Sequence, residues 1–222
     1  MKKKYLILDT ESNGPQRYAE IWQIAWQTTD PHFTPIKADG GYLEPHDRMA
    51  HDAIMITGLT RQDLKKKAEP ADGLYKRLLK DLRGCKAIIG HSVEMDIDRL
   101  INDSAKRCSP EVAARVKEAL KATPYYDTMA HTVELVGKVI RRTFWSFRGP
   151  AYVKKLGFPS LRELADKLTV DRTGITAHTA DGDVELTRRC MAAMKDSHRE
   201  LVKDLIHNKI LNPNTCYCWQ QA

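Results

Sequence analysis

The sequence lacks any long hydrophobic run, and this absence argues against two classes of protein. No apolar stretch among its 222 residues approaches the roughly 20 residues that a transmembrane helix needs. The apolar run that follows the N-terminal lysines lasts four residues before Asp9, which is too short for the hydrophobic core of a signal peptide. We therefore expect a cytoplasmic protein that has no membrane partner.

The chain also has little cysteine. Its five cysteines are an odd and scattered set, which favours reduced thiols over a disulfide framework. Cys216 and Cys218, with His207, suggest a zinc site, but a spacing of one residue is shorter than structural zinc sites use and a fourth ligand is not evident. We interpret this part of the chain as a packed tail without metal.

Acidic residues are outnumbered, because 29 Asp and Glu stand against 36 Lys and Arg, for a formal net charge of +7. A basic chain favours polyanionic partners, either nucleic acid or an anionic membrane surface. The basic residues do not form one amphipathic helix, so the membrane surface is the less supported partner. With 42% hydrophobic residues the chain can bury one substantial core, and we expect a single domain over 1–222.

Strand and helix patterns predict an α/β fold. Three strand-like segments, 4–9, 21–29 and 36–43, come first and are separated by turn residues, which is typical of an antiparallel meander. Two short apolar strands are expected at 87–89 and 125–126. Helical patterns occupy 50–56, 61–66, 71–82, 93–104, 110–121, 127–136, 160–168 and 180–207. We therefore expect a mixed five-stranded sheet flanked by helices.

Two carboxylates, Asp9 and Glu11, follow the first apolar strand directly. Residues two apart along a strand face the same side, so the two side chains can converge. At such a distance they repel each other unless a cation lies between them or one is protonated, and carboxylate oxygens suit Mg²⁺ or Mn²⁺ better than zinc. An isolated pair of this kind is more often a strand end that meets solvent, so the interpretation needs further acids.

A third acid is expected from the helix over 93–104. Its apolar stripe leaves Asp96 roughly 85° from the stripe centre and Asp98 roughly 115°, so Asp96 borders the core while Asp98 leans toward solvent. Ser92 is a suitable N-cap for this helix. An ordinary amphipathic helix with polar flanks explains this segment about as well.

A histidine and a fourth acid precede and begin the helix over 180–207. Thr179 is a suitable N-cap, which places His178 in the preceding loop and Asp183 in the first turns, where the two can converge. A histidine so placed can take a proton from a water molecule, while Asp183 holds a metal ion. Alone, His178 would more often be a surface or capping residue.

Together the sequences DTESNG (9–14), HSVEMDIDRL (91–100) and HTADGDV (178–184) resemble, in order and spacing, the three motifs of the DEDDh family of 3′→5′ exonucleases. ITGLT (56–60) and YDT (126–128) are similar to further family segments. The resemblance covers about 4–195, with a C-terminal helix and tail over 196–222. It implies the ribonuclease H-like exonuclease fold.

The resemblance also implies residue roles. Asp9, Glu11, Asp96 and Asp183 would surround two Mg²⁺ or Mn²⁺ ions, with His178 as general base in the release of nucleoside 5′-monophosphates. Asp98 and Asp103 are excluded as ligands by their spacing. Where relatives usually carry Asn and an aromatic residue in the second motif, this chain has Ser92 and Met95, which puts the substrate contacts of that Asn in doubt.

Expected substrate contacts fall into two groups. Thr10, Ser12 and His91 lie beside the motif acids, near the expected position of the 3′ end. The segment 138–155 carries six positive charges and no acid, interleaved with aromatic residues, so that Trp145 and Arg148 could belong to a single-strand platform. The alternative, weighed equally, is that these aromatic residues belong to a core under a long loop.

The favoured function is removal of nucleotides from DNA with a free 3′ end. An exoribonuclease and a catalytically silent nucleic-acid-binding module are the alternatives, and the motifs do not separate DNA from RNA. The biological pathway and the oligomeric state stay open, with a homodimer among the options.

Overall fold

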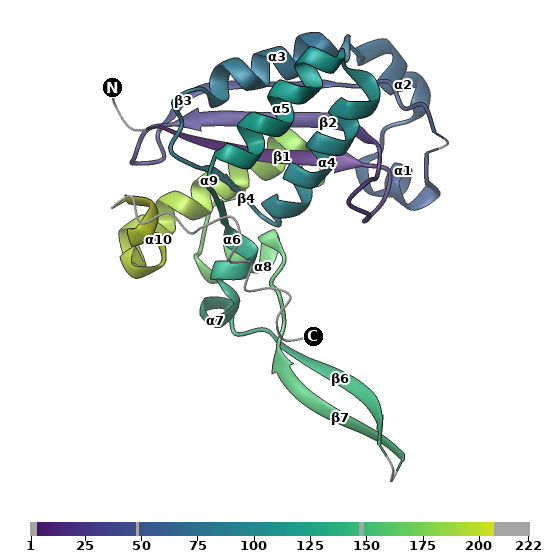
Figure 1. Cartoon of the computed structure of the whole chain (residues 1–222). Helices are drawn as coiled ribbons and strands as arrows, with labels where there is room; N and C mark the ends of the chain where they lie inside the picture. Colours follow the sequence, from purple (N-terminus) through teal and green to yellow (C-terminus); the bar gives the residue numbers. More distant parts are fainter. Residues whose placement is uncertain (1–3, 48, 147–148, 207–222) are drawn as a thin grey trace.

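A five-stranded sheet forms the centre of the computed structural model, which describes residues 4–47, 49–146 and 149–206 (Figure 1). The strand order is β3-β2-β1-β4-β5. The first three strands pair antiparallel, and β4 and β5 run parallel to β1. The predicted mixed sheet and its initial meander are therefore confirmed. The strands are β1 (Tyr5–Ser12), β2 (Ile21–Thr29), β3 (Pro35–Tyr42), β4 (Ile88–Gly90) and β5 (Tyr125–Asp127).

Helices cover both faces of this sheet (Figure 1). One layer contains α3, α4 and α5, and α9 packs on the other face. The helices are α1 (His51–Thr57), α2 (Arg61–Lys67), α3 (Ala71–Leu82), α4 (Val93–Arg107), α5 (Pro110–Ala122), α6 (Thr128–His131), α7 (Val133–Val136), α8 (Leu161–Lys167), α9 (Ala180–Ser197) and α10 (Arg199–Ile206). Among the residues that the structure describes, no helix combines the length and the apolar character that a bilayer crossing requires.

Strand β1 is buried on both faces because its alternate side chains enter different cores. Leu6 and Leu8 pack with residues of α3, α4 and α5, whereas Tyr5 and Ile7 pack with residues of α9. The pairing of β1 with β2 continues in register to Glu11. Asp9 and Glu11 therefore lie on the α9 side of the strand, and Thr10 lies on the α4 side. This alternation distributes the motif residues between the two helices.

A β-hairpin projects from the body of the molecule (Figure 1). Strands β6 (Val139–Ser146) and β7 (Gly149–Leu156) pair antiparallel. Val139 and Leu156 stand opposite each other and are exposed. The segment is thus a hairpin rather than the long loop that one interpretation assumed. The sequence prediction missed these strands because their apolar and basic residues do not alternate regularly.

Two predicted helices are each divided. The helix expected over 180–207 ends at Ser197, because His198 leaves helical geometry with φ −137° and ψ 56°, and α10 follows. The helix expected over 127–136 is two short helices joined at Thr132, whose φ is −112°. Apolar periodicity continues across both breaks, so it did not reveal them.

Candidate active site

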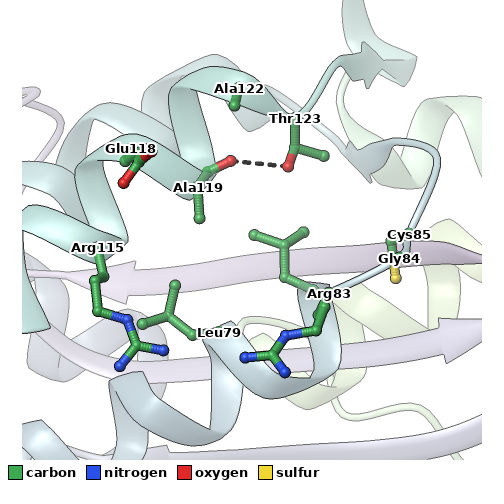
Figure 2. Close-up of a pocket in the computed structure, with 10 residues that line it drawn as sticks. Leu79, Arg83, Gly84, Cys85, Arg115, Glu118, Ala119, Ala122 and Thr123 are labelled. Carbon is green, nitrogen blue, oxygen red and sulfur yellow. Dashed lines mark hydrogen bonds between the residues drawn. The ribbon is translucent and has the colours of Figure 1, made fainter.

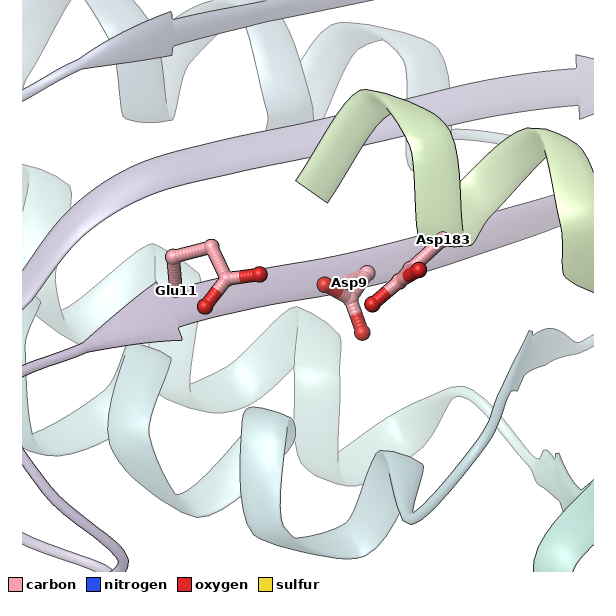
Figure 3. A group of neighbouring side chains, drawn as sticks. All are labelled: Asp9, Glu11 and Asp183. Atoms are coloured by element: carbon pink, nitrogen blue, oxygen red, sulfur yellow. The ribbon is translucent and has the colours of Figure 1, made fainter. Parts of the chain in front are cut away.

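Three carboxylates meet where β1 ends beside the start of α9 (Figure 3). Asp9 and Glu11 project from the strand, and Asp183 projects from the first turn of the helix. Each side chain offers an oxygen, and these oxygens all lie within 4.8 Å of one another. Three oxygen donors at this distance match the ligands that hard divalent cations such as Mg²⁺ and Mn²⁺ prefer. The residues present therefore fit such an ion.

Asp96 approaches the same place from α4 and is 4% exposed. The hydroxyl of Thr10, on the α4 side of β1, donates a hydrogen bond of 2.6 Å to Asp96 Oδ1. Thr10 is one of the predicted substrate contacts, but in this structure its hydroxyl orients an acid. Asp96 borders the core and lines the cavity, as the helical angles predict.

His178 lies outside α9, as predicted, in a left-handed conformation with φ 59°. Thr179 is the N-cap, and its side chain accepts a hydrogen bond of 3.1 Å from the backbone N–H of Gly182. The His178 side chain is exposed at the cavity, and the carboxylate of Asp183 accepts a hydrogen bond from the His178 backbone. The histidine and the acid are therefore adjacent.

The start of α9 is held by Gln23 of β2, which the sequence analysis did not single out. This side chain is buried; its Oε1 accepts from Ala180 N at 3.2 Å, and its Nε2 donates to Asp181 Oδ2 at 2.8 Å. Gly182 leaves no room for a larger residue, since an added Cβ would stand 1.9 Å from the carbonyl oxygen of Thr176. These contacts fix the turn that carries Asp183. In the sequence, the only hint of this role was a glutamine within the largely apolar segment 21–26.

Ser92 is not the side-chain cap that the sequence predicts. It has a left-handed φ of 71° and its hydroxyl makes no capping hydrogen bond. Instead the Ser92 backbone N–H donates at 2.9 Å to Oδ1 of Asp127, at the end of β5. The left-handed backbone of Ser92 directs its N–H toward β5, so that Asp127, at the end of that strand, holds the turn into α4.

His91 lines the cavity, but both of its ring nitrogens have partners. Nε2 donates to the Pro159 carbonyl at 3.0 Å, and Nδ1 lies 3.0 Å from Thr128 Oγ1. Burial lowers the pKa of His91 to about 4, so the ring is neutral near pH 7. In this structure His91 connects the wall of the cavity to the segment after β7.

The cavity has a volume of about 360 Å³. Burial raises the pKa of Asp9 well above its usual range, and the charges of Asp96 and Asp183 add to this effect. Burial and the neighbouring Asp183 raise the pKa of Glu11 to about 7, and burial likewise raises that of Asp96 to about 7. A cation would relieve this crowding of negative charge. The lining residues are Asp9, Thr10, Glu11, Pro15, His91, Ser92, Met95, Asp96, Arg99, His178 and Asp183.

The other predicted residues lie elsewhere. The hydroxyl of Ser12 donates to the carbonyl of Gly14 at 3.0 Å, and Ser12 is not among the lining residues. Asp98 pairs with Arg17, and Asp103 accepts hydrogen bonds from Tyr75 and Arg107; neither acid lines the cavity. Trp145 belongs to β6, while Arg148, His207, Cys216 and Cys218 lie outside the described residues.

A second cavity, also of about 360 Å³, lies between the ends of α3 and α5 (Figure 2). Its polar groups include the side chains of Arg83 and Arg115, and its apolar lining includes Leu79 and Ala119. It holds one carboxylate, that of Glu118. This cavity offers no cluster of ligands for a cation, and we do not regard it as an active site.

Comparisons with known proteins agree with the motifs and the fold. The family model for exonucleases, RNase_T, matches residues 6–190. No curated protein sequence matches the chain significantly. Among solved structures, E. coli exonuclease I in complex with a dA16 oligonucleotide is 19% identical, with a TM-score of 0.67 over 92% of this chain and 43% of that chain. The zinc-bound form of the E. coli exonuclease I complex with single-stranded DNA is 20% identical, with a TM-score of 0.68 over 93% and 43%. The chain thus spans less than half the length of these proteins and shares their fold.

Proposed function

Because the chain belongs to the exonuclease family, whose model covers all three motifs, we propose that it removes nucleotides from the 3′ ends of DNA in a metal-dependent reaction. The family predicted from the motifs is thereby confirmed. One observation carries the proposal: the oxygens of Asp9, Glu11 and Asp183 lie within 4.8 Å of one another in a cavity that Asp96 and His178 also line. Acids that can hold metal ions and a base that can take a proton from water are groups suited to metal-assisted phosphodiester hydrolysis.

The four acids would form two adjacent binding sites for divalent ions. Asp9, Glu11 and Asp183 would bind one ion between them, and Asp96, oriented by Thr10, would complete a site for a second. Two ions of Mg²⁺ or Mn²⁺ would polarise the scissile phosphate and stabilise the charge that develops on the attacking and leaving oxygens. The protein supplies the fixed geometry, because Gln23 and Thr179 hold the first turn of α9.

His178 is the proposed general base. Its side chain is exposed at the cavity rather than packed in the core, so a water molecule can reach it. His178 directly precedes Thr179, the N-cap of α9, and lines the same cavity as Asp183. A base in this position takes the proton of the attacking water, which gives a nucleoside 5′-monophosphate as product.

DNA is the proposed substrate. The solved E. coli exonuclease I structures with similar folds are complexes with DNA oligonucleotides. A formal net charge of +7 also favours a polyanion. RNA remains the alternative for the test below, since no residue described in the cavity is specific for deoxyribose.

The β6–β7 hairpin is the proposed binding platform for the strand. Residues 138–155 contain no acid, and Lys154 and Lys155 form no ion pair among the described residues. Lys154 stands opposite Arg141 in the hairpin, so basic residues from both strands occupy neighbouring positions. The segment that follows the hairpin is joined to the cavity wall by the hydrogen bond between His91 and Pro159. Trp145 and Arg148 stay predictions for this platform.

A digestion assay tests the reaction. Matched single-stranded and duplex DNA and RNA, labelled at the 5′ end, are incubated with the protein and Mg²⁺ or Mn²⁺. We expect DNA shortened stepwise from the 3′ end, release of 5′-monophosphates, and no activity with EDTA or in Asp9→Asn. Faster cleavage of RNA would select the exoribonuclease, and intact substrates under every condition would indicate a binding module.

The platform is tested by the dependence of binding on salt. The double variant Lys154→Ala/Lys155→Ala should lower the slope of log affinity against log salt by about 1.4 if each lysine contacts one phosphate of a single strand. Lys65→Ala/Lys66→Ala, on the exposed face of α2, is the matched control and should keep the slope of the unmodified protein. Equal slopes for both double variants would exclude the hairpin as the platform.

The remaining predictions concern the whole protein. A single domain over 1–222 predicts one cooperative unfolding transition by calorimetry. Sedimentation of the purified protein distinguishes a monomer from a homodimer, and the cytoplasmic location can be tested by fractionation.

A further inference from the structure

One arginine stands in the acidic cavity. Arg99 is the only Lys or Arg among the cavity's lining residues in the described part of the chain. It follows Asp96 by one turn of α4, and its Nη1 lies 3.7 Å from Asp96 Oδ1. Its side chain is 12% exposed, so solvent screens its charge only weakly. A largely buried cation beside four carboxylates is a feature that the proposed function does not use.

The guanidinium is oriented by backbone carbonyls. Nε donates to the carbonyl of Gln16 at 3.2 Å, and Nη2 donates to that of Gly14 at 3.1 Å. These partners are neutral, and the distance to Asp96 is longer than a hydrogen bond. The positive charge is therefore fixed in place and acts on Asp9, Glu11 and Asp96. Burial raises the pKa values of Asp9, Glu11 and Asp96, and Arg99 opposes the rise in each case.

The same helix holds the rest of this loop. Asn102 Nδ2 donates to the carbonyl of Arg17 at 3.2 Å, and Lys106 Nζ donates to that of Tyr18 at 3.4 Å. With Arg99, these residues follow one stripe of α4 at i, i+3 and i+7. The loop forms a wall of the cavity through Pro15, directly after β1. Arg99 is the member of the stripe that joins this wall to the acids.

A charge balance suggests why a cation belongs here. Asp9, Glu11, Asp96 and Asp183 carry −4 when ionised, two divalent ions carry +4, and the phosphodiester that is cleaved carries −1. The +1 of Arg99 brings the assembled site to zero. Without substrate and ions, Arg99 is the only permanent positive charge that offsets the four acids among the described lining residues.

We propose that Arg99 is a positioning residue with two separable effects: its charge offsets the carboxylate cluster, and its planar fork clamps the wall at Gly14 and Gln16 for the terminal nucleotide. This inference rests on the proposed function, because the terminal nucleotide enters only if the cavity is the nuclease site. The two effects require different properties of the side chain. Lysine retains the charge and loses the fork, whereas methionine loses both.

Titration calorimetry with Mn²⁺ on the full-length protein tests the charge. Removing a fixed positive charge from the neighbourhood of a divalent ion should strengthen its binding, so we expect Arg99→Met to bind Mn²⁺ about three- to tenfold more tightly. Arg99→Lys should stay within about twofold of the unmodified protein. Arg17→Met is the matched control: Arg17 joins the same loop to Glu94 and Asp98 of α4, outside the cavity, and its loss should leave Mn²⁺ affinity unchanged.

Steady-state kinetics on a single-stranded oligonucleotide test the clamp. Both variants should raise KM about tenfold, because a wall without its fork no longer holds the terminal nucleotide in place. The kcat of Arg99→Lys should fall less than its KM rises. Circular dichroism and thermal melting show whether each variant is folded. If Arg99→Met does not fold, the KM of Arg99→Lys is the deciding measurement.

The outcomes separate this inference from the proposed function. Weaker Mn²⁺ binding in folded Arg99→Met, or an unchanged KM in both variants, would overturn the role of Arg99. Absence of Mn²⁺ binding and of cleavage in the unmodified protein would instead overturn the proposed function, and with it this inference.

Discussion

Two cavities of the same volume lie at opposite ends of strands β4 and β5, and their contents are opposite in charge. The cavity at the carboxyl ends, beyond Gly90 and Asp127, contains Asp9, Glu11, Asp96 and Asp183. The cavity at the amino ends, before Ile88 and Tyr125, contains Arg83 and Arg115. Each measures about 360 Å³, so size alone does not distinguish an active site from a surface depression.

The direction of the chain explains the difference. Helices α4 and α9 begin at the acidic cavity, with Asp96 and Asp183 in their first turns. Helices α3 and α5 end at the other cavity, and each has a lysine in its last turn. Helix N-termini stabilise negative charge and C-termini positive charge. Ligands bind beyond the carboxyl ends of parallel strands in open α/β sheets, which agrees with this arrangement.

Burial separates the two cavities further. Asp96 is 4% exposed, whereas the side chain of Arg115 is 50% exposed. Charges held in a protein interior interact strongly, while exposed charges are screened by water. Substitutions in the acidic cavity should therefore have large effects, and substitutions in the arginine cavity small ones.

The largest effect is expected from Asp183→Asn. Loss of one ligand should lower kcat/KM about 10⁴-fold, because metal ions supply several kcal/mol of transition-state stabilisation. The metal-free variant should also unfold at a higher temperature, since burial raises the pKa of Asp183 and the ionised form therefore opposes folding. Activity assays and thermal melts with EDTA measure both. Full activity of Asp183→Asn would show that the acidic cavity is not the site of catalysis.

The next effect is expected from His178→Ala. Loss of a general base should lower kcat by about 10²-fold or more while divalent ions still bind, because His178 is not among the three clustered carboxylates. Single-turnover rates and Mn²⁺ titration on the same preparation separate the two properties. A variant that loses Mn²⁺ binding would make His178 a ligand instead of a base.

Divalent ions that bind in the acidic cavity should stabilise the folded protein. At a concentration 100 times the dissociation constant, Mg²⁺ contributes about 2.7 kcal/mol, which corresponds to roughly 5–10 °C in Tm for a chain of this size. The shift should disappear in Asp9→Asn, which lacks one of the three clustered carboxylates. A shift of equal size in this variant would place the ion elsewhere.

A smaller effect is expected from pH in the metal-free protein. The pKa values of Glu11 and Asp96 are raised to about 7 in the fold, above their usual values, so the folded state binds more protons than the unfolded state. The free energy of unfolding should therefore fall as pH rises from about 5 to 7, and Asp96→Asn should reduce this slope. Urea unfolding with EDTA at several pH values measures it. Slopes that do not differ between the two proteins would contradict the raised pKa of Asp96.

The sequence predicted the acidic cavity better than its supporting contacts. Strand alternation places Asp9 and Glu11 together, helical angles place Asp96 at the cavity, and the N-cap at Thr179 places His178 outside the helix. The clamp of Arg99 was not predictable, because its partners Gly14 and Gln16 lie 85 and 83 residues away in the chain. The prediction of Ser92 as a side-chain cap was wrong for a related reason, since its backbone N–H pairs with Asp127, a partner 35 residues away on another strand. Periodicity in the sequence predicts on which face of a helix or strand a side chain lies. Partners that are distant in the chain become known only from the three-dimensional structure.

The smallest effect is expected from Arg115→Met in the arginine cavity. The ion pair of Arg115 with Glu111 has a distance of 3.8 Å between Nη1 and Oε1, and both side chains are largely exposed, so its loss should cost at most about 0.5 kcal/mol of unfolding free energy. Nuclease activity and Mn²⁺ affinity should stay unchanged, because α5 contributes no lining residue to the acidic cavity within the described chain. Urea unfolding and the digestion assay measure these quantities. A clear loss of activity would mean that the arginine cavity, at the amino ends of the strands, also contacts the substrate. The difference in charge between the two cavities would then not separate a functional site from a surface depression.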